Sequence, residues 1–200
     1  MNDIAKHYDL LIDENNDPVH DPEPLRKYMD KWDGQGFIES LELNKSKSIL
    51  EIGVGTGRLA IKIAPLCSEF TGIDLSEKTI IKAKENLADF ENTNLICDNY
   101  LSVNLGKTFD VIYSSLTFMH IKEKQIAINK VFDLLNNNGI FALSIDKNQS
   151  NTIDAGISKI SIYPDNPAEI ESYIKSSGLT IIKQYETEFA YIFIAKKKLK

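Results

Sequence analysis

The sequence contains few cysteines, little positive charge and no long apolar run. Its two cysteines, Cys67 and Cys97, are spaced for neither a metal site nor a redox motif. We therefore expect both to be small, buried, reduced hydrophobes, which is typical of a cytoplasmic protein. No apolar run approaches the roughly 20 residues that span a bilayer. The acidic start of the chain lacks the basic-then-apolar order of a secretion signal, so we expect no membrane partner.

Positive charge is scarce as well, because 29 acidic residues face 23 lysines and arginines and leave a net charge of -6. A protein that binds duplex nucleic acid usually has a basic face. The one basic cluster, Lys196–Lys198 with Lys200, is interpreted as a solvated tail, and no nucleic-acid partner is expected. A chain of 200 residues with 42% hydrophobic content suits one globular domain with a sizeable core.

Short apolar runs alternate with helix-like segments after residue 45. The pattern predicts helices over Gly57–Ala64, Ser76–Leu87 and Lys122–Leu135, and a fourth that begins at Asn166 and closes at Gly178. Ser76 and Asn166 are the expected N-caps, and Gly139 the expected left-handed cap. The predicted strands are Ser48–Ile52, Phe70–Ile73, Asn94–Cys97, Phe109–Ser114, Ile140–Ile145, Leu179–Glu186 and Phe189–Ala195.

This alternation predicts an α/β fold with a doubly wound, mostly parallel sheet of seven strands. The last two strands have almost nothing between them, so they must form an antiparallel hairpin. The segment Phe189–Ala195 is apolar on both alternating faces, which indicates a strand inside the sheet. We expect it to lie between the fifth strand and its own hairpin partner.

Residues 1–45 differ from the rest of the chain. They combine acids, asparagines and prolines with two helix-like pieces, Leu25–Lys31 and Gly34–Leu43. We interpret them as an N-terminal cap over the ligand edge of the sheet, and residues 46–200 as one ligand-binding unit.

Three glycines occupy alternate positions in ILEIGVGTGRLA, residues 49–60, just behind the first strand. Ligands of an open parallel sheet lie beyond the carboxyl ends of its strands, where glycine permits a sharp turn and a close approach. A dinucleotide fingerprint is G-x-G-x-x-G, but here the third glycine, Gly57, comes one residue early and Arg58 takes its place. Glu51 would oppose a pyrophosphate and suits an ammonium or sulfonium group. The pattern favours an amino-acid-bearing nucleoside over NAD.

This motif, together with GIDLS (residues 72–76), FDVIYSSLTFMHI (residues 109–121) and GIFALSI (residues 139–145), resembles the class I S-adenosylmethionine-dependent methyltransferases. The resemblance covers about residues 45–196. It implies a Rossmann-like fold, S-adenosyl-L-methionine as the cofactor and methyl transfer as the activity. Two alternatives stay open: a protein that binds this cofactor without catalysis, and an NAD(P)-dependent oxidoreductase. The inserted segments are small, which favours a small-molecule substrate, and the sequence indicates no particular oligomeric state.

The resemblance also implies roles for individual residues. Glu51 and the backbone of the glycine motif would hold the methionine moiety, Asp74 both ribose hydroxyls, and Leu75 the adenine. The other implied cofactor contacts are Gly53, Gly55 and Gly57 in the motif, Arg58 at the cofactor carboxylate, Asp98 and Asn99 at the adenine amino group with Tyr100 beside them, and Ser114 on the methionine and substrate side.

Some of these residues have structural alternatives. Asp74 could cap the helix that follows it, and Asp98 lies in a polar loop where acids are common. His120 is a candidate general base or a packing residue, and Tyr8 either closes over the cofactor or docks the N-terminus. No ligand partners accompany His7 or His20, so we expect no metal.

Overall fold

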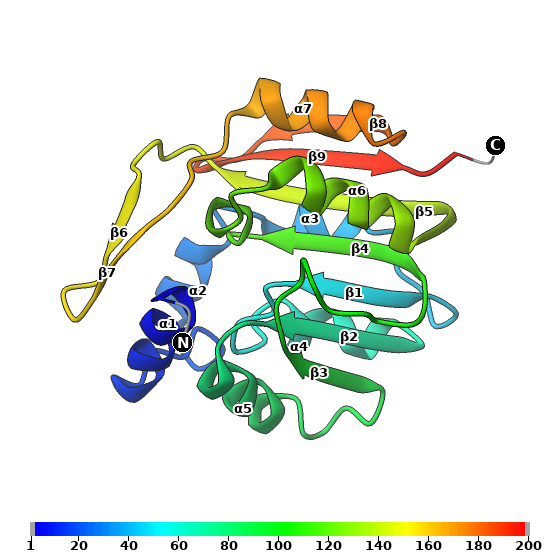
Figure 1. Cartoon of the computed structure of the whole chain (residues 1–200). Coiled ribbons are helices and arrows are strands. Elements are labelled where there is room, and N and C mark those ends of the chain that lie inside the picture. The colour runs from blue at the N-terminus through cyan, green and yellow to red at the C-terminus, as the bar shows by residue number, and fades with distance from the viewer. Residues whose placement is uncertain (1–2, 199–200) are drawn as a thin grey trace.

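A computed structural model describes residues 3–198 and places seven strands of this range in one sheet (Figure 1). The strand order is β3-β2-β1-β4-β5-β9-β8. The first five are parallel, and β9 is antiparallel to both β5 and β8, as the sequence predicts. The strands are β1 (Ser48–Ile52), β2 (Glu69–Asp74), β3 (Thr93–Cys97), β4 (Phe109–Ser115), β5 (Leu135–Asp146), β8 (Thr180–Glu186) and β9 (Ala190–Lys196).

Helices cover both faces of this sheet. Ile49 and Tyr113 face the helices α3 (Gly34–Glu39), α4 (Ala60–Ile63) and α5 (Glu77–Asn86), whereas Leu50 and Ile112 face α6 (Lys124–Leu134) and α7 (Pro167–Ser176). Successive residues of a strand point to opposite faces, so a central strand that is covered on both sides is apolar throughout. This is why the strands can be read from the sequence as continuous apolar runs.

The first crossover helix is shorter than its predicted range of 57–64. It covers only Ala60–Ile63 and passes into the 3-10 turn η1 (Ala64–Leu66). The three glycines of the motif have positive φ values of 78°, 56° and 100°, which keep the chain out of the helical region until Leu59. Pro65 lacks an N–H group and lies in the 3-10 turn, where an α-helix could not continue without loss of a hydrogen bond.

The helix caps are partly as predicted. The Ser76 hydroxyl accepts a hydrogen bond from the Thr79 amide at 3.1 Å, and the Asn166 side chain accepts from two amides of α7. The prediction for Gly139 is wrong, because Asn138 has the left-handed φ of 62° and β5 begins directly after α6. Gly139 is needed for space instead: a Cβ there would lie 2.8 Å from the Asn136 carbonyl oxygen.

Three elements precede the sheet, and a small hairpin projects from it. The N-terminal elements are α1 (Asp3–Asp13), α2 (Glu23–Met29) and α3, of which α1 was not predicted. The unpredicted hairpin pairs β6 (Thr152–Asp154) with β7 (Lys159–Ser161). Figure 1 shows α1 and this hairpin beside the edge where β1 and β4 end. Both insertions therefore lie at the edge of the sheet where a ligand is expected.

The structure corrects the expectations for Cys97 and for the lysines near the C-terminus. Cys67 is buried, but Cys97 is exposed, because it ends the edge strand β3. Lys196 pairs with Glu42 at 3.2 Å, and Lys197 donates to two carbonyl groups at the end of α6, so these lysines attach the last strand to its neighbours. Lys200 lies outside the described residues.

Within residues 3–198, no helix has the length and apolar character that a membrane span requires.

Candidate functional site

A cavity of about 610 Å³ lies at the carboxyl ends of β1, β2 and β4. Its size falls within the range of about 300–1,000 Å³ that is usual for small-molecule sites. The sheet order reverses between β1 and β4, which is the position where open α/β sheets bind ligands. The lining comes from the glycine loop, the strand ends, residues 98–101, α1, and the short 3-10 turn η2 (Phe118–His120).

The glycine loop forms the part of the cavity that follows β1. Gly53 has a left-handed φ of 78°, and a Cβ there would lie 2.0 Å from the Thr117 hydroxyl oxygen, so no other residue fits. The amides of Gly53 and Val54 both donate to the Ile73 carbonyl, at 2.9 and 3.0 Å, which ties the loop to β2. Gly57 does not line the cavity, and a Cβ there would lie 3.4 Å from the side chain of Leu87, just beyond α5. We therefore assign Gly57 to the turn rather than to ligand contact, which corrects the sequence prediction.

Glu51 is a buried acid that borders this cavity. It lies near the end of β1 with only 3% of its surface exposed, and the Tyr113 hydroxyl donates to its Oε2 at 2.8 Å. Burial raises the pKa of Glu51 to about 8, although the bond from Tyr113 and the charge of Arg58 lower it. In the free protein the carboxyl is therefore protonated at neutral pH. A cationic group bound beside it would stabilise the ionised form.

Asp74, at the end of β2, connects three parts of the site. Its Oδ2 accepts from the Gly55 amide at 3.0 Å and its Oδ1 from the Ser76 amide at 3.1 Å. Burial raises the pKa of Asp74, and these backbone bonds oppose the shift. The Asp98 amide donates to the Asp74 carbonyl at 2.9 Å, which brings Asp98 and Asn99 to the rim of the cavity.

Comparison with known proteins agrees with this geometry. Residues 50–141 match a family model described as a methyltransferase domain. Malonyl-acyl-carrier-protein O-methyltransferase 1 from Ilyobacter polytropus is 33% identical over 108 residues, which cover 53% of this chain and 40% of that protein. An uncharacterized methyltransferase from Bacillus cereus (strain 03BB102) is 36% identical over 113 residues, or 54% of this chain and 52% of that protein. The chain thus spans about half the length, or less, of these curated relatives.

A solved structure shows the same fold over nearly the whole chain. The N-methyltransferase NodS from Bradyrhizobium japonicum WM9, in complex with S-adenosylhomocysteine, superposes with a TM-score of 0.70 at 15% identity. The superposition covers 98% of this chain and 99% of that one. Over residues 50–141 the chain is similar to the class I S-adenosylmethionine-dependent methyltransferases, and it shares their fold.

S-adenosylmethionine, the cofactor of this family, fits the residues that line the cavity. The cofactor carries an ammonium and a sulfonium group, and Glu51 is a buried carboxyl with no cation bonded to it in residues 3–198. The Thr56 hydroxyl is buried and has no partner among the described residues, which leaves a polar atom for a ligand to satisfy. Sequence reasoning missed Thr56, although its position between two motif glycines was a usable signal.

Two further predicted cofactor contacts differ from expectation. Ser114 does not line the cavity; it is fully buried, and its hydroxyl donates to the Ile52 carbonyl at 2.8 Å. Its neighbour Ser115 lines the cavity instead, because adjacent strand residues point to opposite faces. Arg58 does line the cavity, but its guanidinium forms a two-point ion pair with buried Asp33. Burial by itself would lower the pKa of Arg58, but the ion pair with Asp33 raises it above its ordinary value.

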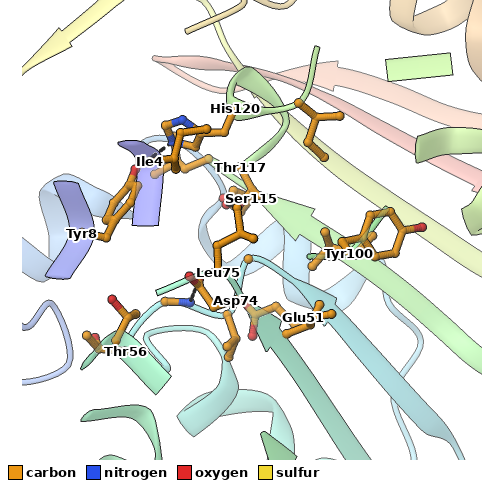
Figure 2. Close-up of a pocket in the computed structure, with 18 of the residues that line it drawn as sticks. Ile4, Tyr8, Glu51, Thr56, Asp74, Leu75, Tyr100, Ser115, Thr117 and His120 are labelled. Carbon is orange, nitrogen blue, oxygen red and sulfur yellow. Dashed lines mark hydrogen bonds between the residues drawn. The ribbon is translucent and has the colours of Figure 1, made fainter. Parts of the chain in front are cut away.

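The remaining predicted residues lie around the same cavity. Leu75, Asp98, Asn99 and Tyr100 all contribute to its lining, and the Tyr100 hydroxyl turns away to donate to the Ala127 carbonyl at 3.1 Å. Tyr8 and His120 also line it, and they lie together in the upper left of Figure 2, with Glu51 and Asp74 lower in the view. The described residues contain no cluster of three or more His, Cys, Asp or Glu side chains suited to a metal ion.

Proposed function

We propose that this protein transfers a methyl group from S-adenosylmethionine to a small molecule. The observation that carries the proposal is the buried Glu51 beside a left-handed glycine loop, at the switch point of the sheet. A buried acid at this position stabilises a bound cation, whereas it gives the pyrophosphate of a dinucleotide no positive charge to pair with. The curated relatives named as methyltransferases align with about half of this chain.

Each part of the cofactor has a proposed partner in the site. Glu51 and the amides of the Gly53–Gly55 loop hold the methionine moiety, and Asp74 accepts from the ribose hydroxyls. Leu75 packs on the adenine, with Asp98 and Asn99 at its amino group. Arg58 remains a candidate for the cofactor carboxylate, because a guanidinium has five N–H groups and Asp33 engages only part of them.

The chemistry needs alignment more than acid–base catalysis. When bound, the cofactor supplies a methyl group on a positively charged sulfur. A lone pair of the acceptor forms the new bond to the methyl carbon, the electron pair of the broken C–S bond stays on sulfur, and the acceptor loses its proton. The protein holds the two reactants in line and excludes water, which the apolar lining from α1 promotes.

The first prediction distinguishes a methyltransferase from an oxidoreductase that has the same sheet topology. We expect the protein to bind S-adenosylmethionine and S-adenosylhomocysteine but not NADH, because the loop has Arg58 where a dinucleotide motif has glycine. Titration calorimetry with each ligand is the measurement. Tight NADH binding without S-adenosylhomocysteine binding would refute the proposal. A methyl-transfer assay on an acceptor panel then distinguishes an enzyme from a protein that only binds the cofactor.

The second prediction concerns residues 1–45, which we propose act as a cap that tightens on ligand binding. Helix α1 is attached to α5 by Asp9, which accepts from the Ser76 hydroxyl at 2.6 Å and the Lys78 amide at 3.1 Å. Because α1 also lines the cavity, a bound ligand should add contacts and slow amide exchange there. Hydrogen exchange with and without S-adenosylhomocysteine measures this, with α6 as the internal control. Equal α1 protection in both states would show that α1 is a fixed part of the fold.

A further inference from the structure

Tyr8 and His120 form a hydrogen-bonded pair in the part of the cavity lined by α1 and η2. The Tyr8 hydroxyl lies 2.8 Å from His120 Nε2, and the two rings meet edge to face with their centroids 5.4 Å apart (Figure 2). The other imidazole nitrogen, Nδ1, is buried and has no partner among the described residues. A buried polar atom without a partner is costly, so this nitrogen is suited to a hydrogen bond with a ligand.

Neither member of the pair carries a charge at neutral pH. Burial, with smaller contributions from His7 and Lys124, lowers the pKa of His120 to about 4. Burial and the nearby Asp74 raise the pKa of the Tyr8 phenol. The pair therefore offers hydrogen bonds but no positive charge to a bound molecule.

The described lining of the cavity also contains no buried cation without a partner. Of the two basic residues in its described lining, Arg58 is paired with Asp33 and approaches Asp30 at 3.9 Å, and Lys122 is exposed. A carboxylate acceptor would have to leave water and would face Asp74 without a free basic partner in the interior. The lining around the pair favours an apolar body instead: Ile4, Leu11, Ile12, Leu116 and Ile121.

The turn that carries His120 is held by a buried ion pair. The Lys124 ammonium donates to the Phe118 and Tyr163 carbonyl groups, each at 2.8 Å, and pairs with Asp165 at 2.7 Å. The Tyr163 amide donates to the Met119 carbonyl at 2.8 Å. These bonds place the His120 ring before any ligand arrives, which is the arrangement expected of a recognition site.

We propose that Tyr8 and His120 bind the methyl acceptor, and that this acceptor is an uncharged apolar molecule whose hydroxyl or amine nucleophile bonds to the pair. A carboxylate is the disfavoured acceptor, because the described lining holds no buried cation without a partner. This inference rests on the proposed function, since it concerns the second substrate of the same cavity. It also separates this chain from any relative that methylates a carboxylate.

Binding to the full chain saturated with S-adenosylhomocysteine tests the inference. The probes are aromatic fragments, each in three matched forms: an aryl alcohol, an uncharged aryl amine and a carboxylic acid, as in naphthol, naphthylamine and naphthoic acid. A malonyl thioester is added as a further carboxylate. Thermal shift ranks the probes, and calorimetry gives the affinities. We expect alcohols or amines to bind and their matched acids to bind at least tenfold more weakly, because the acid must be desolvated without a cation.

Variants then show whether the pair is responsible. Tyr8→Phe and His120→Gln should each lower the affinity for the best neutral probe about five- to tenfold, which is the effect of one lost neutral hydrogen bond. Both should leave the affinity for S-adenosylhomocysteine within about twofold, which also shows that they fold. Tyr28→Phe and His20→Gln are the matched controls, because neither residue lines the cavity.

Each outcome decides the matter. Three results would overturn the inference: acids that bind as tightly as the matched alcohols, neutral probes whose affinity is the same for the parent and both variants, or no neutral probe that binds. If the unmodified protein does not bind S-adenosylhomocysteine, the proposed function is refuted instead, so the two failures are distinguishable.

Discussion

Replacement of Asp74 with alanine is expected to weaken S-adenosylhomocysteine binding by roughly 10²- to 10⁴-fold. Two charge-assisted bonds to the ribose hydroxyls would be lost, each worth about 1.5–3 kcal/mol. The Asp74 carboxylate also accepts from the Gly55 and Ser76 amides, so the glycine loop would lose one of its anchors. The predicted loss therefore combines a missing ligand contact with a less ordered loop.

Calorimetry on Asp74→Ala measures this effect, and Asp74→Asn separates its two causes. Asparagine keeps one acceptor oxygen but removes the charge, so its affinity should fall between those of the parent and the alanine variant. Asp89→Ala is the control, because Asp89 is exposed beyond the end of α5 and does not line the cavity. An unchanged dissociation constant in a folded Asp74→Ala protein would remove Asp74 from the site.

Affinity for S-adenosylhomocysteine should also depend steeply on pH through Glu51. The free protein holds a proton on this carboxyl up to a pKa of about 8, but a bound ammonium requires the ionised form. Ligand binding at neutral pH must therefore release a proton. The affinity should fall about tenfold for each pH unit below about 8, or roughly 100-fold by pH 6.

The Glu51→Gln variant identifies the source of this dependence. Glutamine cannot ionise, so its affinity should be lower than that of the parent at pH 8 and nearly flat between about pH 6 and 8. Calorimetry in two buffers of different ionisation enthalpy counts the released proton, which should disappear in the variant. A parent protein that binds equally well at both ends of this range would contradict the assignment of Glu51.

The same residue predicts a change in stability in the opposite direction. The pKa of Glu51 rises from its ordinary value of 4.5 to about 8 on folding. Between these values the folded protein holds a proton that the unfolded chain has released, so its free energy of unfolding decreases as pH rises. Glu51→Gln should therefore be more stable than the parent near pH 8, and the difference should shrink toward pH 4.5. Denaturant unfolding of both proteins without ligand measures it.

The sequence alone was sufficient to predict the sheet and the edge at which the cavity lies. The strands are visible because burial on two faces requires apolar residues throughout, as in the segment Phe189–Ala195, which the structure places between β5 and β8. The position of Glu51 and the glycines follows from local chain geometry, since a strand must turn immediately where the motif stands. The cap residues Ser76 and Asn166 also act on amides two or three positions away.

Local pattern could not decide which of two neighbouring side chains enters the cavity. Ser114 and Ser115 are the same residue type, and only the pairing of β4 with β1 and β5 determines which one lines the cavity. Helix α1 was missed for a related reason. Its bonds from Asp9 to the start of α5 join segments far apart in the chain, and short helices depend on such contacts more than on their own propensity.

The proposed acceptor end of the cavity depends on tertiary structure alone. Tyr8 and His120 are 112 residues apart, and no spacing rule relates a residue of α1 to one that follows β4. No sequence pattern indicated that Arg58 is paired within the protein, and only folding placed buried Asp33 against it. Sequence patterns report each residue's local backbone and burial, whereas the charge that a ligand meets depends on which distant groups folding brings within a few ångströms.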